Sequence, residues 1–172
     1  MLDWVRENGA RAIVGNHERK FLSCLQVPEE ERNVKARALL APFEDALQAY
    51  GDWIASWPLW IEWHDLLAVH AGVEPGVERL EAMAHRVLLT IRTWDGTGVE
   101  LDRIGDPAWY QVAKWPVPVV FGHWAAGGLV DLPSCKGLDT GCVYGGKLTA
   151  WSPEERRFWH VKAHREWLPH KD

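Results

Sequence analysis

The chain has 172 residues, of which 47% are hydrophobic and 25% are charged, and its formal net charge is −5. This length suits one domain with a packed core, and the composition is that of an ordinary globular protein. The negative charge makes an extended nucleic-acid backbone an unfavourable partner. No apolar run has the length of a membrane span or the pattern of a signal peptide. The three cysteines form no C-x-x-C pair, which favours a reducing cytoplasm.

The N-terminal third is expected to be mostly helical. Residues 2–8 predict the end of a helix that stops at Gly9, and residues 12–14 predict a strand. Residues 18–26 are expected to be helical, and the charge run 29–32 to begin a solvated helix. A further helix is predicted to start at a proline and to end at Pro58, because apolar residues recur at helical spacing: Pro42, Phe43, Leu47, Tyr50, Ile54 and Trp57.

The middle of the chain combines a hairpin, a helix and irregular structure. Residues 59–63 and 66–70 predict a hairpin that turns at His64-Asp65. An amphipathic helix is expected from Val77 to Ile91, ending near Arg92. Turn-forming residues occupy 95–98, and residues 99–116 are expected to form an irregular lid.

The C-terminal part predicts strands at 117–121, 136–139, 147–151 and 157–162. Residues 152–155 form the turn between the last two of these. Residues 163–172 are expected to be a loose tail.

Tryptophan is unusually frequent, with twelve in the chain, and four of them precede the strand at 66–70: Trp53, Trp57, Trp60 and Trp63. Large aromatic side chains bury much area, so packing is the favoured explanation for most of them. One or two could instead stack on adenine rings.

Three short segments share one pattern, in which a strand-forming apolar run stops at a histidine beside a glycine. They are residues 11–18 (RAIVGNHE), 66–72 (LLAVHAG) and 117–123 (VPVVFGH). Polar groups at the ends of buried strands converge on one crevice. Glycine allows the sharp turn or the close approach of a ligand. One oxygen and two imidazoles could therefore form half of a transition-metal site: Asn16, His70 and His123.

Residues 141–148 (GCVYGGKL) nearly match the phosphate loop G-x-x-x-x-G-K-[ST]. Leu148 replaces the hydroxyl residue that binds magnesium, and a strand, a turn and a strand are expected here in place of an anion-binding helix. The sequence therefore predicts a glycine-rich turn packed under the site, with Tyr144 as a candidate neighbour of the substrate.

The order GNHE, VHAG, FGH resembles the calcineurin-like metallophosphoesterase superfamily. Residues 121–125 (FGHWA) and 138–149 (LDTGCVYGGKLT) look like its symmetrical diadenosine tetraphosphatase branch. Further agreement comes from Ile91-Arg92 with Leu101-Asp102, and from the segment 107–110. The resemblance runs from about Val14 to Val161. It implies an α/β fold, a sandwich of two mixed sheets flanked by helices.

The sequence departs from the family at its N-terminal side. The family's GD-x-H/Q-G and GD-x-x-[DN]-RG motifs precede GNHE and supply the first metal's ligands, but nothing before residue 15 matches either of them. We therefore expect an N-terminally truncated domain over residues 1–162, with a helical cap at about 19–58 and a tail at 163–172. The strand at 12–14 would then have an unpaired edge, so the chain alone is expected to be unstable or to self-associate.

The resemblance assigns roles to individual residues. It makes His17 the general acid, and it makes Asn16, His70 and His123 the ligands of the second metal. Arg92 would clamp a phosphate through its planar guanidinium. Glu18 would orient its neighbours. The remaining histidines are expected to be structural: His64, His85, His160, His164 and His170.

The resemblance also implies a reaction. Two divalent metals would support hydrolysis of diadenosine tetraphosphate to two ADP, and Mn²⁺ suits the mixed ligands, as would Co²⁺, Fe²⁺ or Ni²⁺. The alternatives are a PPP-type serine/threonine protein phosphatase with a phosphoprotein substrate, and a catalytically inactive fragment. The three neutral ligands, Asn16, His70 and His123, lack a bridging carboxylate, so at most one ion is expected to bind. No nucleic-acid or membrane partner is expected, and the oligomeric state stays open.

Overall fold

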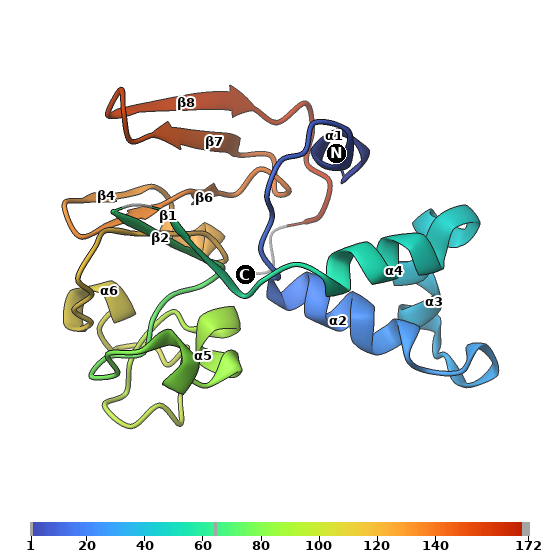
Figure 1. Ribbon diagram of the computed structural model, residues 1–172, viewed down its shortest axis with the longest axis horizontal. Coiled ribbons are helices and arrows are strands. Elements are labelled where there is room, and N and C mark those ends of the chain that lie inside the picture. Colours follow the sequence, from blue (N-terminus) through green and yellow to red (C-terminus); the bar gives the residue numbers. More distant parts are fainter. Residues whose placement is uncertain (1, 64, 170–172) are drawn as a thin grey trace. The chain divides into compact units, whose positions relative to one another are not determined.

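The computed structural model describes residues 2–63 and 65–169, and Figure 1 shows the course of the chain. The chain forms two compact units, Met1–Ile61 and Glu62–Asp172. The first unit is helical, and the second is built on sheets. Among the described residues, no helix combines the length and the apolar character needed to cross a bilayer.

The first unit consists of helices whose starts are set by local hydrogen bonds. The Glu18 carboxylate accepts a hydrogen bond from the Gly15 N–H (2.9 Å) at the start of α2, and the Asn33 side chain accepts one from the Ala36 N–H (2.9 Å) at the start of α3. The elements are α1 (Leu2–Glu7), α2 (Asn16–Leu25), η1 (Glu29–Glu31), α3 (Val34–Leu40), η2 (Ala41–Ala46) and α4 (Leu47–Ala55).

The core of this unit lies between α2, α3 and α4. Phe21, Leu40 and Ile54 are buried together, one from each helix. Helices α2 and α4 come close at Gly51, where an added Cβ would lie 2.3 Å from a Leu25 methyl carbon. Partly buried residues surround the core, among them Phe43, Tyr50, Trp53 and Trp57. The packing role expected for Trp53 and Trp57 is therefore confirmed.

Three sequence predictions in this unit have clear outcomes. The helix at 2–8 is present as α1, and Gly9 follows it with φ of 60°. The strand at 12–14 is wrong: residues 10–15 form no strand, and the Val14 N–H donates to the Pro58 carbonyl (2.9 Å). The unpaired strand edge from which instability was expected is therefore not formed by these residues. The helix predicted from Pro42 is divided into the 3-10 turn η2 and the α-helix α4.

The second unit contains two sheets among its described residues. The larger has the order β1-β2-β3-β5-β4, in which β2, β3 and β5 run parallel and β4 runs antiparallel to β5. Leu67 pairs with Val119, and Val119 with Cys135. The strands are β1 (Trp60–Trp63), β2 (Leu66–Val69), β3 (Val119–Phe121), β4 (Val130–Leu132) and β5 (Cys135–Gly137). Strand β1 begins in the first unit.

The smaller sheet has the order β6-β7-β8 and is antiparallel in its pairings. Within this unit, α5 and α6 lie on the opposite side of the larger sheet from β7 and β8 (Figure 1). The expectation of an α/β fold with two sheets and flanking helices is confirmed. The elements are β6 (Asp139–Thr140), β7 (Lys147–Ser152), β8 (Arg157–Lys162), η3 (Leu80–Ala82), α5 (His85–Thr90), α6 (Trp109–Val112) and η4 (Ala125–Gly127).

The predicted strand pairs of this unit are present, although the turn at His64 lies outside the described residues. The long helix from Val77 to Ile91 is wrong. Met83 and Ala84 are extended (ψ of 140° and 130°) and separate η3 from α5. Strand β4 was not predicted.

Residues 99–116 and 163–168 are more ordered than the sequence suggested. The first segment contains α6, whose Trp109 is among the largest fully buried side chains, so it is not a lid alone. The loose tail is wrong for residues 163–168. The Ala163 N–H donates to the Gly146 carbonyl (2.9 Å), and the Trp167 and Leu168 N–H groups donate to the Val143 carbonyl (2.9 and 3.1 Å).

The core of the first unit predicts a stability effect. Ile54→Ala should lower the free energy of unfolding by about 2–5 kcal/mol, because it removes buried carbons and leaves a cavity. Val34→Ala is the matched control, since Val34 is 82% exposed, and it should change that free energy by less than about 0.5 kcal/mol. Urea denaturation monitored by circular dichroism measures both. Equal effects would contradict the core described here.

Candidate active site

Three parallel strands end at one edge of the larger sheet, and a polar residue follows each of them. His70 comes directly after β2, His123 two residues after β3, and Asp139 two residues after β5. The register of β2, β3 and β5 brings these ends together. Ligand sites in open α/β sheets form at the carboxyl ends of such strands.

The two histidines meet directly. His70 Nε2 lies 3.2 Å from His123 Nδ1, and the rings are arranged edge to face with centroids 5.0 Å apart. The Gly122 N–H donates to the His70 carbonyl (2.9 Å), which ties the two strand ends together. His123 itself has φ of 67°, a left-handed backbone conformation that residues other than glycine rarely adopt.

His123 is biased towards its neutral form. Burial lowers the pKa of this imidazole, and the positive charge of Arg92 lowers it further. Hydrogen bonding to the Thr90 backbone and the charges of Asp139 and Asp102 act in the opposite direction but do not reverse the shift. A neutral imidazole is the form that can bind a metal ion.

Arg92 lies close to the histidine pair, two residues after α5 ends. Its Nη1 pairs with Asp102 Oδ2 at 2.5 Å. The side chain is 35% exposed, whereas its Nε is buried and has no hydrogen-bond partner among the described residues. The guanidinium is therefore partly accessible, and its positive charge acts on His123.

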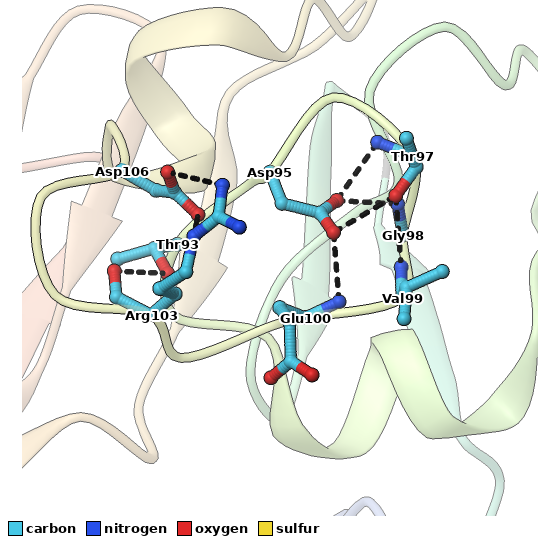
Figure 2. A network of polar contacts seen from close by, with 8 residues as sticks. All are labelled: Thr93, Asp95, Thr97, Gly98, Val99, Glu100, Arg103 and Asp106. Atoms are coloured by element: carbon cyan, nitrogen blue, oxygen red, sulfur yellow. Dashed lines mark hydrogen bonds and ion pairs between the residues drawn. The ribbon is translucent and has the colours of Figure 1, made fainter.

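The loop that carries Asp102 is held by two polar clusters, which Figure 2 shows. The Asp95 carboxylate accepts hydrogen bonds from the N–H groups of Thr97, Gly98 and Glu100 (2.8, 2.7 and 2.9 Å). These bonds, led by the one from Glu100, hold the pKa of Asp95 well below its usual range. Arg103 forms a bidentate pair with Asp106, with both N–O distances at 2.9 Å.

Asn16 and His17 belong to the first unit, where they begin α2. His17 is exposed and Asn16 is half-buried. Glu18 accepts the Gly15 N–H, so it fixes the turn that presents both residues. Of the predicted site residues, the structure brings together His70, Arg92 and His123. For Asn16 and His17 it gives their position at the start of α2 and their exposure.

The histidine pair fits two ligands of one transition-metal ion. Two nitrogens that each lie about 2.1 Å from one ion are about 3.0–3.4 Å apart when the ligand angle is about 90–110°, and the observed 3.2 Å falls in that range. A ligand histidine usually hydrogen-bonds a second group, a role the Thr90 backbone can serve for His123. No three His, Cys, Asp or Glu side chains within residues 2–63 and 65–169 form a metal-binding group, so further donors are needed.

The sequence analysis assigned no role to Asp139, although the LDTG segment was recognised. Its charge acts on His123, and its Cβ would be 3.8 Å from a Cβ added at Gly122. The signal was available, because Asp139 follows a strand as both histidines do.

The fold matches a solved structure. A crystal structure provisionally assigned as a diadenosine tetraphosphatase superposes with a TM-score of 0.74 and 24% sequence identity, over 94% of this chain and 72% of that one. The likeness shows the fold alone: a mixed α/β fold with two sheets and flanking helices. No protein-family model matches the sequence.

Sequence comparison finds relatives that share one name, symmetrical bis(5'-nucleosyl)-tetraphosphatase. The chain is 27% identical to the symmetrical bis(5'-nucleosyl)-tetraphosphatase of Delftia acidovorans in an alignment of 200 residues, covering 81% of this chain and 70% of the relative. It is 50% identical over 54 residues to the enzyme of that name from Janthinobacterium sp. (strain Marseille), and 43% identical over 63 residues to that of Methylobacillus flagellatus. The resemblance predicted from the motifs is confirmed.

The two shorter alignments cover limited parts of both partners. They include 31% and 35% of this chain, and 20% and 23% of the two relatives. The chain therefore aligns with about a fifth to a quarter of these relatives' length.

The Asp95 cluster predicts a pH-dependent contribution to stability. A carboxylate whose pKa is lowered by folding stabilises the fold above its unfolded pKa of about 4, and this contribution declines as the pH falls towards the folded pKa. Asp95→Asn should lower Tm by a few degrees at pH 7, and the difference from the unsubstituted protein should shrink at pH 3. Thermal unfolding at both pH values measures it.

The matched control is Glu78→Gln, which neutralises an exposed carboxylate outside this loop. It should leave Tm nearly unchanged at pH 7. A Tm difference for Asp95→Asn that grows on acidification would show that the sign is wrong.

Proposed function

We propose that this chain carries the catalytic unit of a metal-dependent phosphoesterase that hydrolyses diadenosine tetraphosphate symmetrically to two ADP. One observation carries the proposal: His70, His123 and Arg92 converge at the carboxyl edge of the parallel strands. Similarity to relatives named symmetrical tetraphosphatases supports this substrate. Two imidazoles and a guanidinium suit a metal ion and a polyphosphate.

The proposed metal ligands are Asn16, His70 and His123. Mn²⁺ is the proposed ion, because divalent manganese accepts mixed oxygen and nitrogen ligands, and Co²⁺, Fe²⁺ or Ni²⁺ would serve similarly. When bound, such an ion supplies charge stabilisation of phosphoryl oxygens and a more acidic water. His123 is suited to its part because its lowered pKa favours the neutral ring.

Arg92 and His17 carry the remaining proposed roles. Arg92 would bind a phosphate through its guanidinium, because the side chain is 35% exposed and pairs with Asp102 through Nη1. In the hydrolysis, a bond forms between a water oxygen and phosphorus, and the bond to the central bridging oxygen breaks. His17 would give its proton to that oxygen as one ADP leaves. The exposed position of His17 at the start of α2 leaves its ring accessible to substrate.

A cytoplasmic location is the proposed setting. All three cysteines, Cys24, Cys135 and Cys142, are free thiols. Free thiols in this number suit a reducing compartment.

The assigned acid predicts a loss of turnover. When a segment with the family's two aspartate motifs is fused before residue 1, Mn²⁺-dependent release of ADP is expected. His17→Ala should then reduce kcat by ~10²–10⁴, the usual contribution of general acid catalysis. Chromatographic quantification of ADP measures it.

His85→Ala serves as the control, because His85 is exposed on α5 and has no proposed role. It should keep kcat within about twofold. Loss of a phosphate from a phosphoserine peptide, without ADP release, would replace this proposal with the protein phosphatase. No turnover of either substrate would favour the catalytically inactive fragment.

The ligand set predicts weak binding of a single ion. The 172-residue chain should bind at most one Mn²⁺, because three neutral ligands cannot hold two dications close together. His123→Ala should weaken this binding at least ~10-fold, whereas His85→Ala should not. Isothermal titration calorimetry measures both. Two tightly held ions, or binding indifferent to His123, would contradict the assignment.

A further inference from the structure

Trp109 is buried in the second unit and contacts the segments that carry the candidate site. It begins α6, and its side chain is 2% exposed. Sequence considerations left some tryptophans as candidate adenine contacts, but this burial removes Trp109 from that group. Its neighbours in space belong to three different segments.

The first contact is with the segment after β2. An added Cβ at Gly72 would lie 2.4 to 2.7 Å from three atoms of the Trp109 indole, so the ring rests directly against this backbone. Gly72 is two residues from His70. The absence of a side chain at residue 72 therefore allows the indole to define the course of the His70 segment.

The second contact is with β3. The Trp109 and Phe121 rings pack edge to face with centroids 5.0 Å apart. Phe121 is the last residue of β3, and it is 5% exposed. Two residues further on is His123. The same indole thus packs beneath both strand ends.

The third contact is with the Arg92 segment. The Trp109 backbone N–H donates to the Arg92 carbonyl (3.0 Å), and the Trp94 backbone N–H donates to the Pro107 carbonyl (2.9 Å). Thr93 and Ala108 form an antiparallel bridge between these hydrogen bonds. The residue that supports the two histidines is therefore also bonded to the backbone of Arg92.

We propose that Trp109 is a positioning residue for His70, His123 and Arg92. Its indole packs against the segments that carry the two histidines, and its backbone N–H bonds the Arg92 carbonyl. The inference concerns the same site as the proposed function and rests on it for the site's purpose. Well-packed interiors transmit small displacements, so a change in ring size is felt at both strand ends. Groups that orient metal ligands through hydrogen bonds typically affect metal affinity by about 10- to 100-fold, and packing that orients the ligands is expected to act in the same direction.

One feature of Trp109 helps to separate its effect on the site geometry from its effect on the stability of the fold. The Trp109 Nε1 is buried and has no hydrogen-bond partner among the described residues. Phenylalanine would lose part of the ring but would also remove this unsatisfied donor, which limits the loss of stability. Trp109→Phe should therefore alter the geometry of the site more than it alters the fold.

The test compares Trp109→Phe with Trp151→Phe in the 172-residue chain without added metal. Trp151 is a partly buried residue of β7 that packs on Phe158, in the other sheet. The readout is the set of histidine imidazole signals in heteronuclear NMR, assigned with single His→Gln variants. In Trp109→Phe, the signals of His70 and His123 should move while that of His85 stays. Trp151→Phe should leave the His70 and His123 signals in place.

A second readout is Mn²⁺ affinity, which should fall about 10-fold or more in Trp109→Phe and stay within about twofold in Trp151→Phe. Histidine signals and affinity that match in the two variants would overturn the proposal. If Trp109→Phe does not fold, Gly72→Ala decides, because it pushes on the indole without removing it. It should move the same two signals. Unfolding of both variants would make Trp109 a stability residue alone and would also overturn the proposal.

The NMR readout needs neither substrate nor metal, so it is independent of the proposed function. A protein that fails to hydrolyse diadenosine tetraphosphate but shows the two shifted histidine signals would refute the function and support the role of Trp109. An active enzyme whose histidine signals stay in place in Trp109→Phe would support the function and refute the role of Trp109.

Discussion

The parallel pairing of β2 with β3 is the constraint on which the candidate site depends. Two parallel strands hydrogen-bonded in register must end at the same edge of the sheet, so the residues that follow them are neighbours although 53 positions separate them in the chain. Strand β5 extends this arrangement and adds Asp139. A shift of register by one residue would turn every side chain of the strand to the other face and would separate the imidazoles. The register of these short strands therefore fixes the distance between the residues that follow them.

Charge at this edge is balanced locally. Arg92 lowers the pKa of His123 while Asp102 and Asp139 raise it, and Asp102 also pairs with Arg92. An anionic substrate arriving at Arg92 would compete with Asp102 for the guanidinium. The loop behind Asp102 is fixed by hydrogen bonds to Asp95 and by the Arg103–Asp106 pair, so the carboxylate stays within reach. Such an arrangement keeps a cation ordered near a neutral imidazole without leaving its charge uncompensated.

The sequence predicted those parts of the fold that have a strong local signal. The runs that precede His70 and His123 are continuously apolar, and both contain strands. The prediction of a strand at 12–14 was wrong because three apolar residues also suit an extended loop. The backbone of such a loop can form hydrogen bonds outside a sheet. The prediction of a continuous helix from Val77 was wrong because the backbone at Met83 is extended. The helical spacing of apolar residues is the same with or without such a break, so periodicity alone does not reveal it. The contact between Trp109 and Gly72 has no local signal, since 37 residues separate them. The family resemblance supplied the candidate residues, but the packing behind them required the structure.

The left-handed backbone of His123 has a consequence for how this position can vary. A residue with a Cβ pays about 1–2 kcal/mol in this conformation, whereas glycine does not. Substituting glycine here would therefore relax the turn, and the altered protein would fold at least as well while losing one of the two facing imidazoles. Stability and ligand capacity are opposed at this single residue. Selection for thermal stability alone would favour glycine here and would remove a ligand of the site. A histidine at this turn therefore indicates that the function of the imidazole outweighs the cost of the left-handed backbone.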